Sequence, residues 1–144
     1  MTHALERRLL QLAAAVACLV PLTAGSAGVL RGAAFVFRGA VTPDLDSHFR
    51  YLSGIFLGVG IAFASCVPAI ERRGARFRLL GALVVAGGLG RALSLAALGA
   101  PSAGHRFGLA MELGVVPLLL LWQARVARRY RVPATPEPVS TVGR

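Results

Sequence analysis

The sequence predicts an all-α fold, a bundle of four transmembrane helices with both termini in the cytoplasm. Three observations predict it: the composition, four long apolar runs, and the distribution of arginines. Of the 144 residues, 56% are hydrophobic and only 15% are charged, and the mean hydropathy is +0.66. A water-soluble domain of this length would leave much of that apolar surface exposed. A lipid bilayer removes this difficulty.

Four runs are long enough to cross a hydrocarbon core about 30 Å thick, which takes roughly 20 helical residues. They cover about residues 9–30, 51–70, 79–100 and 103–123. The fourth is the least regular, because its strongly apolar part, 109–122, is short. No run alternates polar and apolar residues as barrel strands do, so we expect helices. Pro21 and Pro117 fall inside runs and are interpreted as tolerated kinks.

The ends and connections of this predicted domain, residues 1–131, have their own patterns. The tail at 132–144 contains three prolines and is predicted to be a disordered cytoplasmic segment. Between the first two runs, Phe35 and Phe37 indicate a short interfacial helix.

All sixteen basic residues are arginines, and their positions predict the orientation. Cationic residues that flank spans are retained in the cytoplasm. Eleven arginines lie before the first span, between the second and third, or after the fourth, whereas four lie on the other side. This distribution explains the net charge of +10 without a nucleic-acid partner. The same arginines can hold anionic lipid headgroups in a generic way.

The N-terminus also resembles a secretory signal. Arg7 and Arg8 precede the apolar run, and the small residues of 24–27 follow it. The run of about 22 residues exceeds the 7–15 residues that are usual for a signal core, so we expect it to be retained as a span. Cleavage stays open as the alternative.

The residue types that carry catalysis or bind metals are sparse. Cys18 and Cys66 lie at different expected depths, so a disulfide is not expected. The three histidines are scattered over both sides, and no metal cluster or catalytic triad can be assembled. We therefore expect no cofactor, and the sequence favours a non-enzymatic role.

Small residues recur at a spacing of four in two spans. The first set is Gly54, Gly58 and Ala62, and the second is Ala86, Gly90 and Ser94. Such faces let helices approach closely. Packing inside the bundle and formation of a homo-oligomer are both compatible with them.

Two ionisable residues lie inside apolar runs, Arg91 in the third and Glu112 in the fourth. A lone charge there costs a few kilocalories per mole, so the two residues are expected to pair. They are equidistant in sequence from the junction between Pro101 and Ser102, which places them at similar depth. Arg50, at the start of the second run, is a second candidate partner for Glu112. The sequence thus indicates a candidate intramembrane polar site in the outer half of the bundle, formed by Arg50, Arg91, Ser94 and Glu112.

These residues also carry a family resemblance. The segments are His48 to Gly58, Gly90-Arg91-Ala92-Leu93-Ser94, Gly99-Ala100-Pro101, Glu112 and Pro117. The chain resembles the domain of unknown function 4345 family of small four-helix bacterial membrane proteins, most clearly from about His48 to Leu121. The resemblance implies a multi-pass protein of the bacterial inner membrane, and it implies no activity. The positions that it implies as defining the family are Arg50, Arg91, Ser94, Gly99, Pro101 and Glu112.

Two hypotheses follow. The first is a non-enzymatic membrane component that packs in the bilayer against a second copy or an unknown membrane partner. The alternative is a small binding or transport protein that uses the polar site around Arg91 and Glu112.

Overall fold

The computed structural model describes residues 2–130, and every regular element in that range is helical. Four segments are long and apolar enough to cross a membrane, which confirms the predicted four-helix, all-α fold. The predicted tail, residues 132–144, lies outside the described residues. The elements are α1 (His3–Arg31), the 3-10 turn η1 (Ala33–Phe35), α2 (Pro43–Ala64), the 3-10 turn η2 (Val67–Ala69), α3 (Gly74–Leu98), α4 (Ala103–Ala110), the π-helical turn η3 (Met111–Val115) and α5 (Val116–Tyr130).

The second helix begins at Pro43, eight residues before the apolar run predicted from position 51. Thr42 caps it, because its side chain accepts a hydrogen bond from the amide of Leu45 at 3.2 Å. Proline at the first position and two aspartates in the first turn also favour a helix start. Hydropathy identifies only the apolar part of the helix, so it misses this polar extension. The segment around Phe35 and Phe37 forms only the single turn η1, shorter than the predicted interfacial helix.

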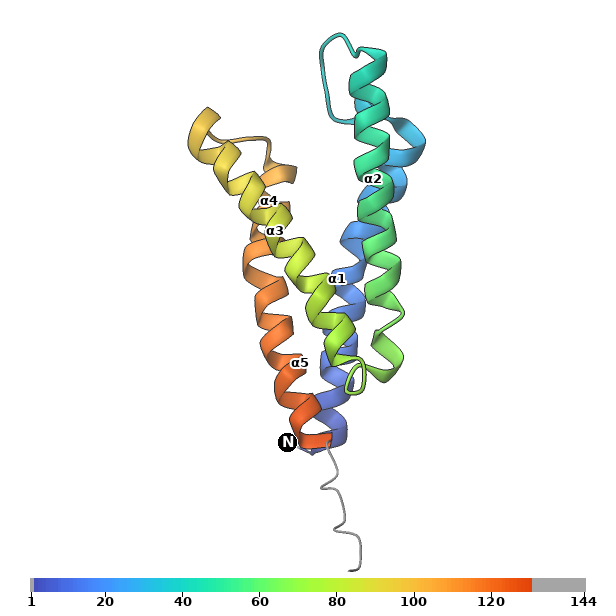
Figure 1. Ribbon diagram of the computed structural model, residues 1–144, viewed down its shortest axis with the longest axis vertical. Coiled ribbons are helices and arrows are strands. Elements are labelled where there is room, and N and C mark those ends of the chain that lie inside the picture. Colours follow the sequence, from blue (N-terminus) through green and yellow to red (C-terminus); the bar gives the residue numbers. More distant parts are fainter. Residues whose placement is uncertain (1, 131–144) are drawn as a thin grey trace, which may run out of the picture.

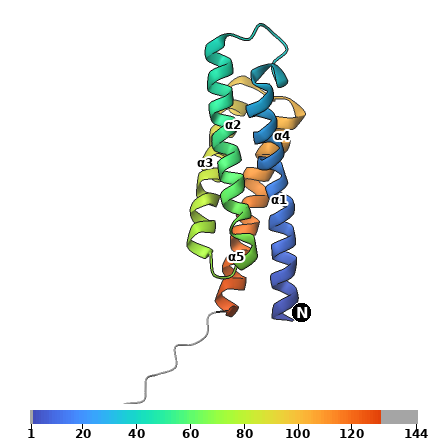
Figure 2. The same cartoon turned by 90° about the vertical axis from the view of Figure 1, so that its right-hand side faces the viewer.

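The helices form two hairpins. Helices α1 and α2 make the first hairpin, and α3 makes the second with the continuous α4–η3–α5 helix. Both hairpins lie close together at the end where α1 begins and α5 ends, here called the terminal end (Figures 1 and 2). They diverge toward the end that holds the connections 32–42 and 99–102, here called the open end (Figure 1).

Glycines set the close approach within each hairpin. A Cβ added at Gly25 would lie 2.8 Å from the backbone nitrogen of Leu57, so α1 and α2 touch through their backbones. A Cβ at Gly60 would lie 3.0 Å from the ring of Pro21. In the second hairpin, Gly81 leaves room for the side chain of Leu120. Small residues permit this kind of packing where lipid supplies no hydrophobic drive between helices.

Buried polar contacts join the two hairpins at the terminal end. Glu6 on α1 is only 3% exposed, and its carboxylate pairs with Arg125, at 3.2 Å, and with Arg129 on α5. Gln123 on α5 is fully buried, and its side-chain amide donates to the carbonyl of Ile70 at 2.8 Å. These contacts cross from one hairpin to the other.

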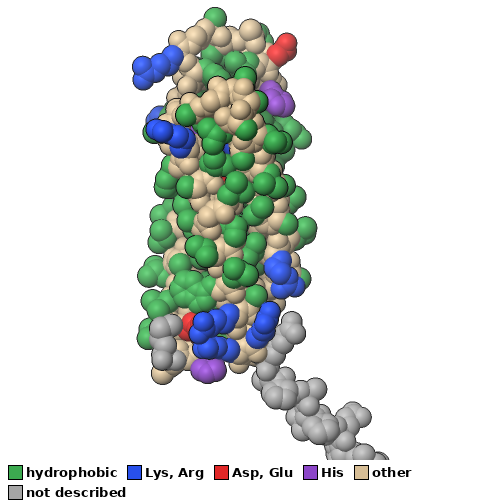
Figure 3. Space-filling model, turned by 90° about the vertical axis from the view of Figure 1, so that its left-hand side faces the viewer, with side chains coloured by type: hydrophobic (Ala, Val, Ile, Leu, Met, Phe, Trp, Pro, Cys, Tyr) green, Lys and Arg blue, Asp and Glu red, His purple; other side chains and the backbone are tan. Residues whose placement is uncertain are grey.

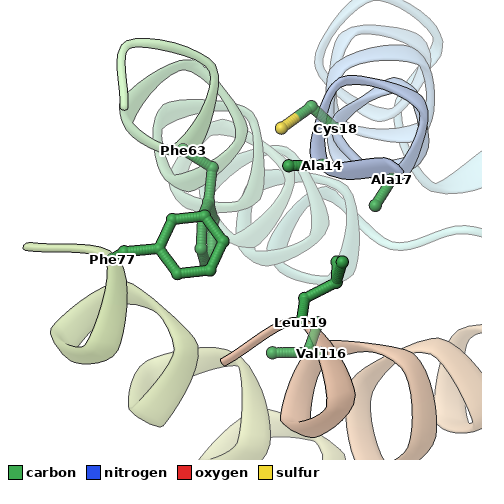
Figure 4. A pocket seen from close by; sticks show the side chains of 7 residues that line it. All are labelled: Ala14, Ala17, Cys18, Phe63, Phe77, Val116 and Leu119. Atoms are coloured by element: carbon green, nitrogen blue, oxygen red, sulfur yellow. The ribbon is translucent and has the colours of Figure 1, made fainter. Parts of the chain in front are cut away.

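An apolar core lies next to these polar contacts. The rings of Phe63 on α2 and Phe77 on α3 pack edge to face with centroids 5.0 Å apart. Beside them is a small apolar cavity of about 40 Å³ that residues of all four long helices line (Figure 4). Cys18 lines it, and both Cys18 and Cys66 are buried free thiols, as expected.

Most residues of the two small-residue faces lie on the surface of the chain, and the exception is Ala62 on α2, which is half-buried against the core. On α3, Ala86, Gly90 and Ser94 are all exposed, and nothing lies within 4 Å of a Cβ added at Gly90. On α2, Gly54 and Gly58 are exposed as well. Packing inside the bundle therefore involves Ala62 but not the exposed α3 set, and other glycines make the closest backbone contacts.

Cationic side chains gather toward the two ends of the molecule, and green apolar side chains cover the middle of the face in Figure 3. This banding fits helices that cross a bilayer. The orientation with both termini in the cytoplasm stays a prediction from the arginine distribution.

The glycine contacts predict a sharp contrast between two identical substitutions. Gly25→Ala forces the α1 and α2 backbones apart, and we expect it to lower the free energy of unfolding by about 2 kcal/mol. Gly58→Ala on the exposed face of α2 meets nothing within 4 Å and should change it by less than about 1 kcal/mol. Thermal unfolding of both variants in the same detergent measures the difference. Equal melting temperatures would show that the backbones do not touch at Gly25.

Candidate functional site

Arg91 on α3 and Glu112 in η3 form the ion pair that the sequence predicts. The Nε atom of Arg91 lies 3.1 Å from Oε1 and 3.0 Å from Oε2 of Glu112. The Glu112 side chain is 9% exposed, whereas that of Arg91 is 40% exposed. The carboxylate is thus enclosed by protein, and the guanidinium lies at the edge of the hairpin.

Gly88 makes room for this pair. A Cβ at Gly88 would lie 2.9 Å from Cβ of Glu112 and 2.7 Å from the side chain of Leu113. Any larger residue would push η3 away from α3 at this level. Arg91 follows three residues later, and its guanidinium carbon lies 4.0 Å from a Cβ built at Gly108 on α4. Glycines on both helices therefore flank the pair.

Glu112 lies in a π-helical turn that Pro117 explains. Proline has no amide hydrogen, and its ring clashes with the carbonyl four residues earlier. The chain widens just before it, so that the amide of Val116 bonds to the carbonyl of Met111 rather than to that of Glu112. Single π turns of this kind are frequent at functional sites. The interpretation of Pro117 as a tolerated irregularity agrees with this local geometry.

Arg50 takes part in a different interaction on the first hairpin. Its Nε donates to Asp46 at 2.7 Å, and one terminal nitrogen donates to the carbonyls of Val29 and Leu30 at the end of α1. Asp46 in turn accepts from the amide of Ala33 at 2.8 Å. Arg50 therefore satisfies carbonyls at the C-terminus of α1, a usual role for arginine. It does not pair with Glu112.

This cap requires glycine at position 32. Gly32 has a φ of 67°, and a Cβ there would overlap the Asp46 carboxylate and the Arg50 guanidinium. The positive φ of Gly32 ends α1 and turns the chain toward η1. The amide of the next residue, Ala33, donates to the Asp46 carboxylate, which stabilises this turn.

The four predicted site residues thus do not assemble into one cluster. The structure brings Arg91 and Glu112 together, holds Arg50 on the other hairpin, and leaves Ser94 exposed on α3. Of the predicted polar site, only the Arg91–Glu112 ion pair is formed. The Arg91 side chain donates to Glu112 through Nε alone, so its two terminal nitrogens are not hydrogen-bonded to any residue within 2–130.

The polar contacts of the terminal end are not among the features predicted above. The arginines there were expected only to set the topology, yet the side chains of Glu6 and Glu71 are both largely buried beside them. Arg7 pairs with Glu71 at 3.0 Å, and Gln11 donates to the carbonyl of Val67 at 2.9 Å. A usable signal was present, because each of these glutamates directly precedes a pair of arginines in the sequence.

None of the described residues forms a group of three or more histidines, cysteines, aspartates or glutamates that could hold a metal ion. At the ion pair, the groups that could bind a ligand are the Arg91 guanidinium and the Glu112 carboxylate.

The ion pair predicts a mutational cycle. Arg91→Met leaves the Glu112 carboxylate enclosed without a partner, and Glu112→Gln leaves the guanidinium without its counter-charge. We expect each change to lower the free energy of unfolding by about 2 kcal/mol and the double variant to regain most of that loss. Thermal unfolding of the four proteins in detergent measures the coupling. If the single variants are as stable as wild type and only a cellular phenotype is lost, the pair is a functional site and not a structural clamp.

Comparisons with known proteins add the family. Residues 9–123 match the family described as "Domain of unknown function (DUF4345)". No curated protein and no solved structure matches the chain. The match covers most of the chain, including the Arg91–Glu112 pair and most of each of the four apolar helices, so this protein belongs to the DUF4345 family.

Proposed function

We propose that this protein is a non-enzymatic, multi-pass component of the inner membrane that works as a homo-oligomer, packing α3 against α3 of a second copy. The observation that carries the proposal is the exposed small-residue face of Ala86, Gly90 and Ser94. Its members are one helical turn apart and form a shallow strip along the helix.

The strip is unusual because the bundle already uses other small residues for its own packing. Gly81 and Gly88 face the second helix of their hairpin and would clash there if enlarged. Gly87 and Gly90 have nothing within 4 Å of an added Cβ. Glycine lowers helix propensity by about 1 kcal/mol, so an exposed glycine without a contact has a cost that a partner helix would offset.

A second copy fits this strip for geometric reasons. A flat strip of small residues is complementary to itself, and two-fold symmetry places one strip against the same strip of a second copy. Ser94 adds a hydroxyl that can donate a hydrogen bond across such an interface. The predicted orientation, with the terminal end in the cytoplasm, is compatible with a parallel pair of α3 helices.

The alternative is a binding or transport protein with a polar site around Arg91 and Glu112. One observation favours it, namely that the terminal nitrogens of Arg91 are not hydrogen-bonded to described residues. Two residues first assigned to this site do not support the alternative, because Arg50 caps α1 and Ser94 is exposed. The mutational cycle described above distinguishes this alternative from a structural clamp.

The proposal predicts that Ala86→Ile disrupts self-association. Isoleucine in the strip would hold two α3 helices apart and should weaken the dimer about tenfold. The control is Ala15→Ile, which makes the same change on the exposed surface of α1, away from any small-residue strip. Energy transfer between donor-labelled and acceptor-labelled copies in liposomes, measured while lipid dilutes the protein, gives both dissociation constants.

Two outcomes would contradict the proposal. One is a wild-type protein that stays monomeric at every lipid ratio. The other is equal weakening by Ala86→Ile and Ala15→Ile, which would place the interface elsewhere or show a non-specific effect.

A further inference from the structure

A polar cavity of about 510 Å³ opens at the terminal end of the bundle. It lies between the N-terminal part of α1, the connection that leads into α3, and the last turns of α5. Three arginines line it, Arg7 from α1, Arg72 from the connection and Arg78 from the first turns of α3. The cavity is separate from the Arg91–Glu112 pair, which lies in the other half of the second hairpin.

The cavity carries a surplus of positive charge. Its lining contains three arginines and one acid, Glu71. That carboxylate is only 8% exposed and is held by Arg7 at 3.0 Å, with Arg72 more distant at 3.9 Å. Arg78 has no acidic partner among the described residues. The nearby Glu6 does not compensate for this charge, because Arg125 and Arg129 already neutralise it.

The backbone adds to the attraction for anions. Gly74, the first residue of α3, lines the cavity, and no side chain caps the first turn of this 25-residue helix. The free amide hydrogens and the helix dipole at such an end favour a negatively charged group. The arginines and the N-terminus of α3 therefore both favour an anion in the same cavity.

The arginines of the lining favour an oxyanion such as phosphate over a simple halide. The planar fork of arginine can give two parallel hydrogen bonds to a tetrahedral oxyanion. Tyr130 at the end of α5 lines the same cavity, eight residues beyond the apolar run of that helix, which ends at Trp122. Aromatic residues are common where a helix leaves the membrane and meets lipid headgroups. Basic pockets between transmembrane helices at this level bind phosphate-bearing headgroups.

We infer that this cavity is a binding site for a phosphate group, presented by the headgroup of an anionic phospholipid such as phosphatidylglycerol. Arg78 and Arg72 bind the phosphate oxygens, and the start of α3 contributes amide donors. Arg7 neutralises Glu71, the one acid of the lining. Because the site joins α1, α3 and α5, a bound headgroup also links the two hairpins at the terminal end.

The test uses the full-length protein in a neutral detergent. Binding to the folded state raises the unfolding temperature by an amount that gives the dissociation constant. The three probes are short-chain phosphatidylglycerol, short-chain phosphatidylcholine and inorganic phosphate. The variant is Arg78→Gln and its control is Arg76→Gln, since Arg76 is exposed on the same helix, does not line the cavity and carries the same charge.

We expect phosphatidylglycerol to stabilise the wild-type and Arg76→Gln proteins with similar dissociation constants and to bind Arg78→Gln about tenfold more weakly. Phosphatidylcholine should shift the unfolding temperature much less. If inorganic phosphate reproduces the whole effect and its dependence on Arg78, the site is real and its ligand is the free ion.

Equal weakening by Arg78→Gln and Arg76→Gln would overturn the proposal, because it would show only the general field of the basic end. Equal binding of the two lipids, or no shift with any probe, would overturn it as well. Should Arg78→Gln not fold, Arg72→Gln with Arg73→Gln as control makes the same comparison. Arg72 is 86% exposed, and Arg73 is the exposed neighbour that does not line the cavity.

Discussion

The buried carboxylate of Glu6 forms ion pairs that join the two hairpins. Among the described residues, ion pairs between the hairpins occur only at this end of the molecule. Two arginines of α5 neutralise it from the other hairpin, and Gln123 adds a fully buried hydrogen bond to the carbonyl of Ile70. A carboxylate enclosed by protein is costly when it has no partner, so these contacts make any separation of the hairpins at this end unfavourable. In a bilayer, apolar surface alone would not hold the hairpins together, because lipid tails solvate it equally well.

The rest of the architecture follows from joining the hairpins at one end. Phe63 and Phe77 pack directly beside the polar contacts, and the hairpins diverge from there toward the open end (Figure 1). The Arg91–Glu112 pair acts within a single hairpin, where it fixes the register of α3 against the π-helical turn. Arg50 acts within the other hairpin, where it closes the end of α1. Faces that neither hairpin uses, above all Ala86, Gly90 and Ser94, are left free for a partner helix.

The depth of a residue in the membrane could be predicted from the sequence, whereas the neighbour that its side chain faces in the bundle could not. Hydropathy counted four helices, and equal spacing about the turn at 101–102 placed Arg91 opposite Glu112, as the structure shows. Arg50 was placed near them because it starts the second span, and Ser94 because it lies nearly one turn after Arg91. Neither argument tells which way the side chain points in the folded bundle. Arg50 instead finds the unsatisfied carbonyls of α1, which lie nearer to it than any residue of the second hairpin, and Ser94 points outward. The partners of Glu6 and Gln123 could not be predicted, because they are 123 and 53 residues away, a separation over which periodicity carries no signal.

In a bilayer, the buried polar contacts of the terminal end should hold the two hairpins together. Spin labels at Arg8 on α1 and Arg128 on α5, both exposed, report the separation of the hairpins there in lipid nanodiscs once both native cysteines are replaced by alanine. We expect a narrow distance distribution for the otherwise unchanged protein. Adding Glu6→Gln together with Gln123→Leu should broaden that distribution and shift it to longer distances. An unchanged, narrow distribution in that variant would contradict the account, because the hairpins would then be held together by something other than these contacts.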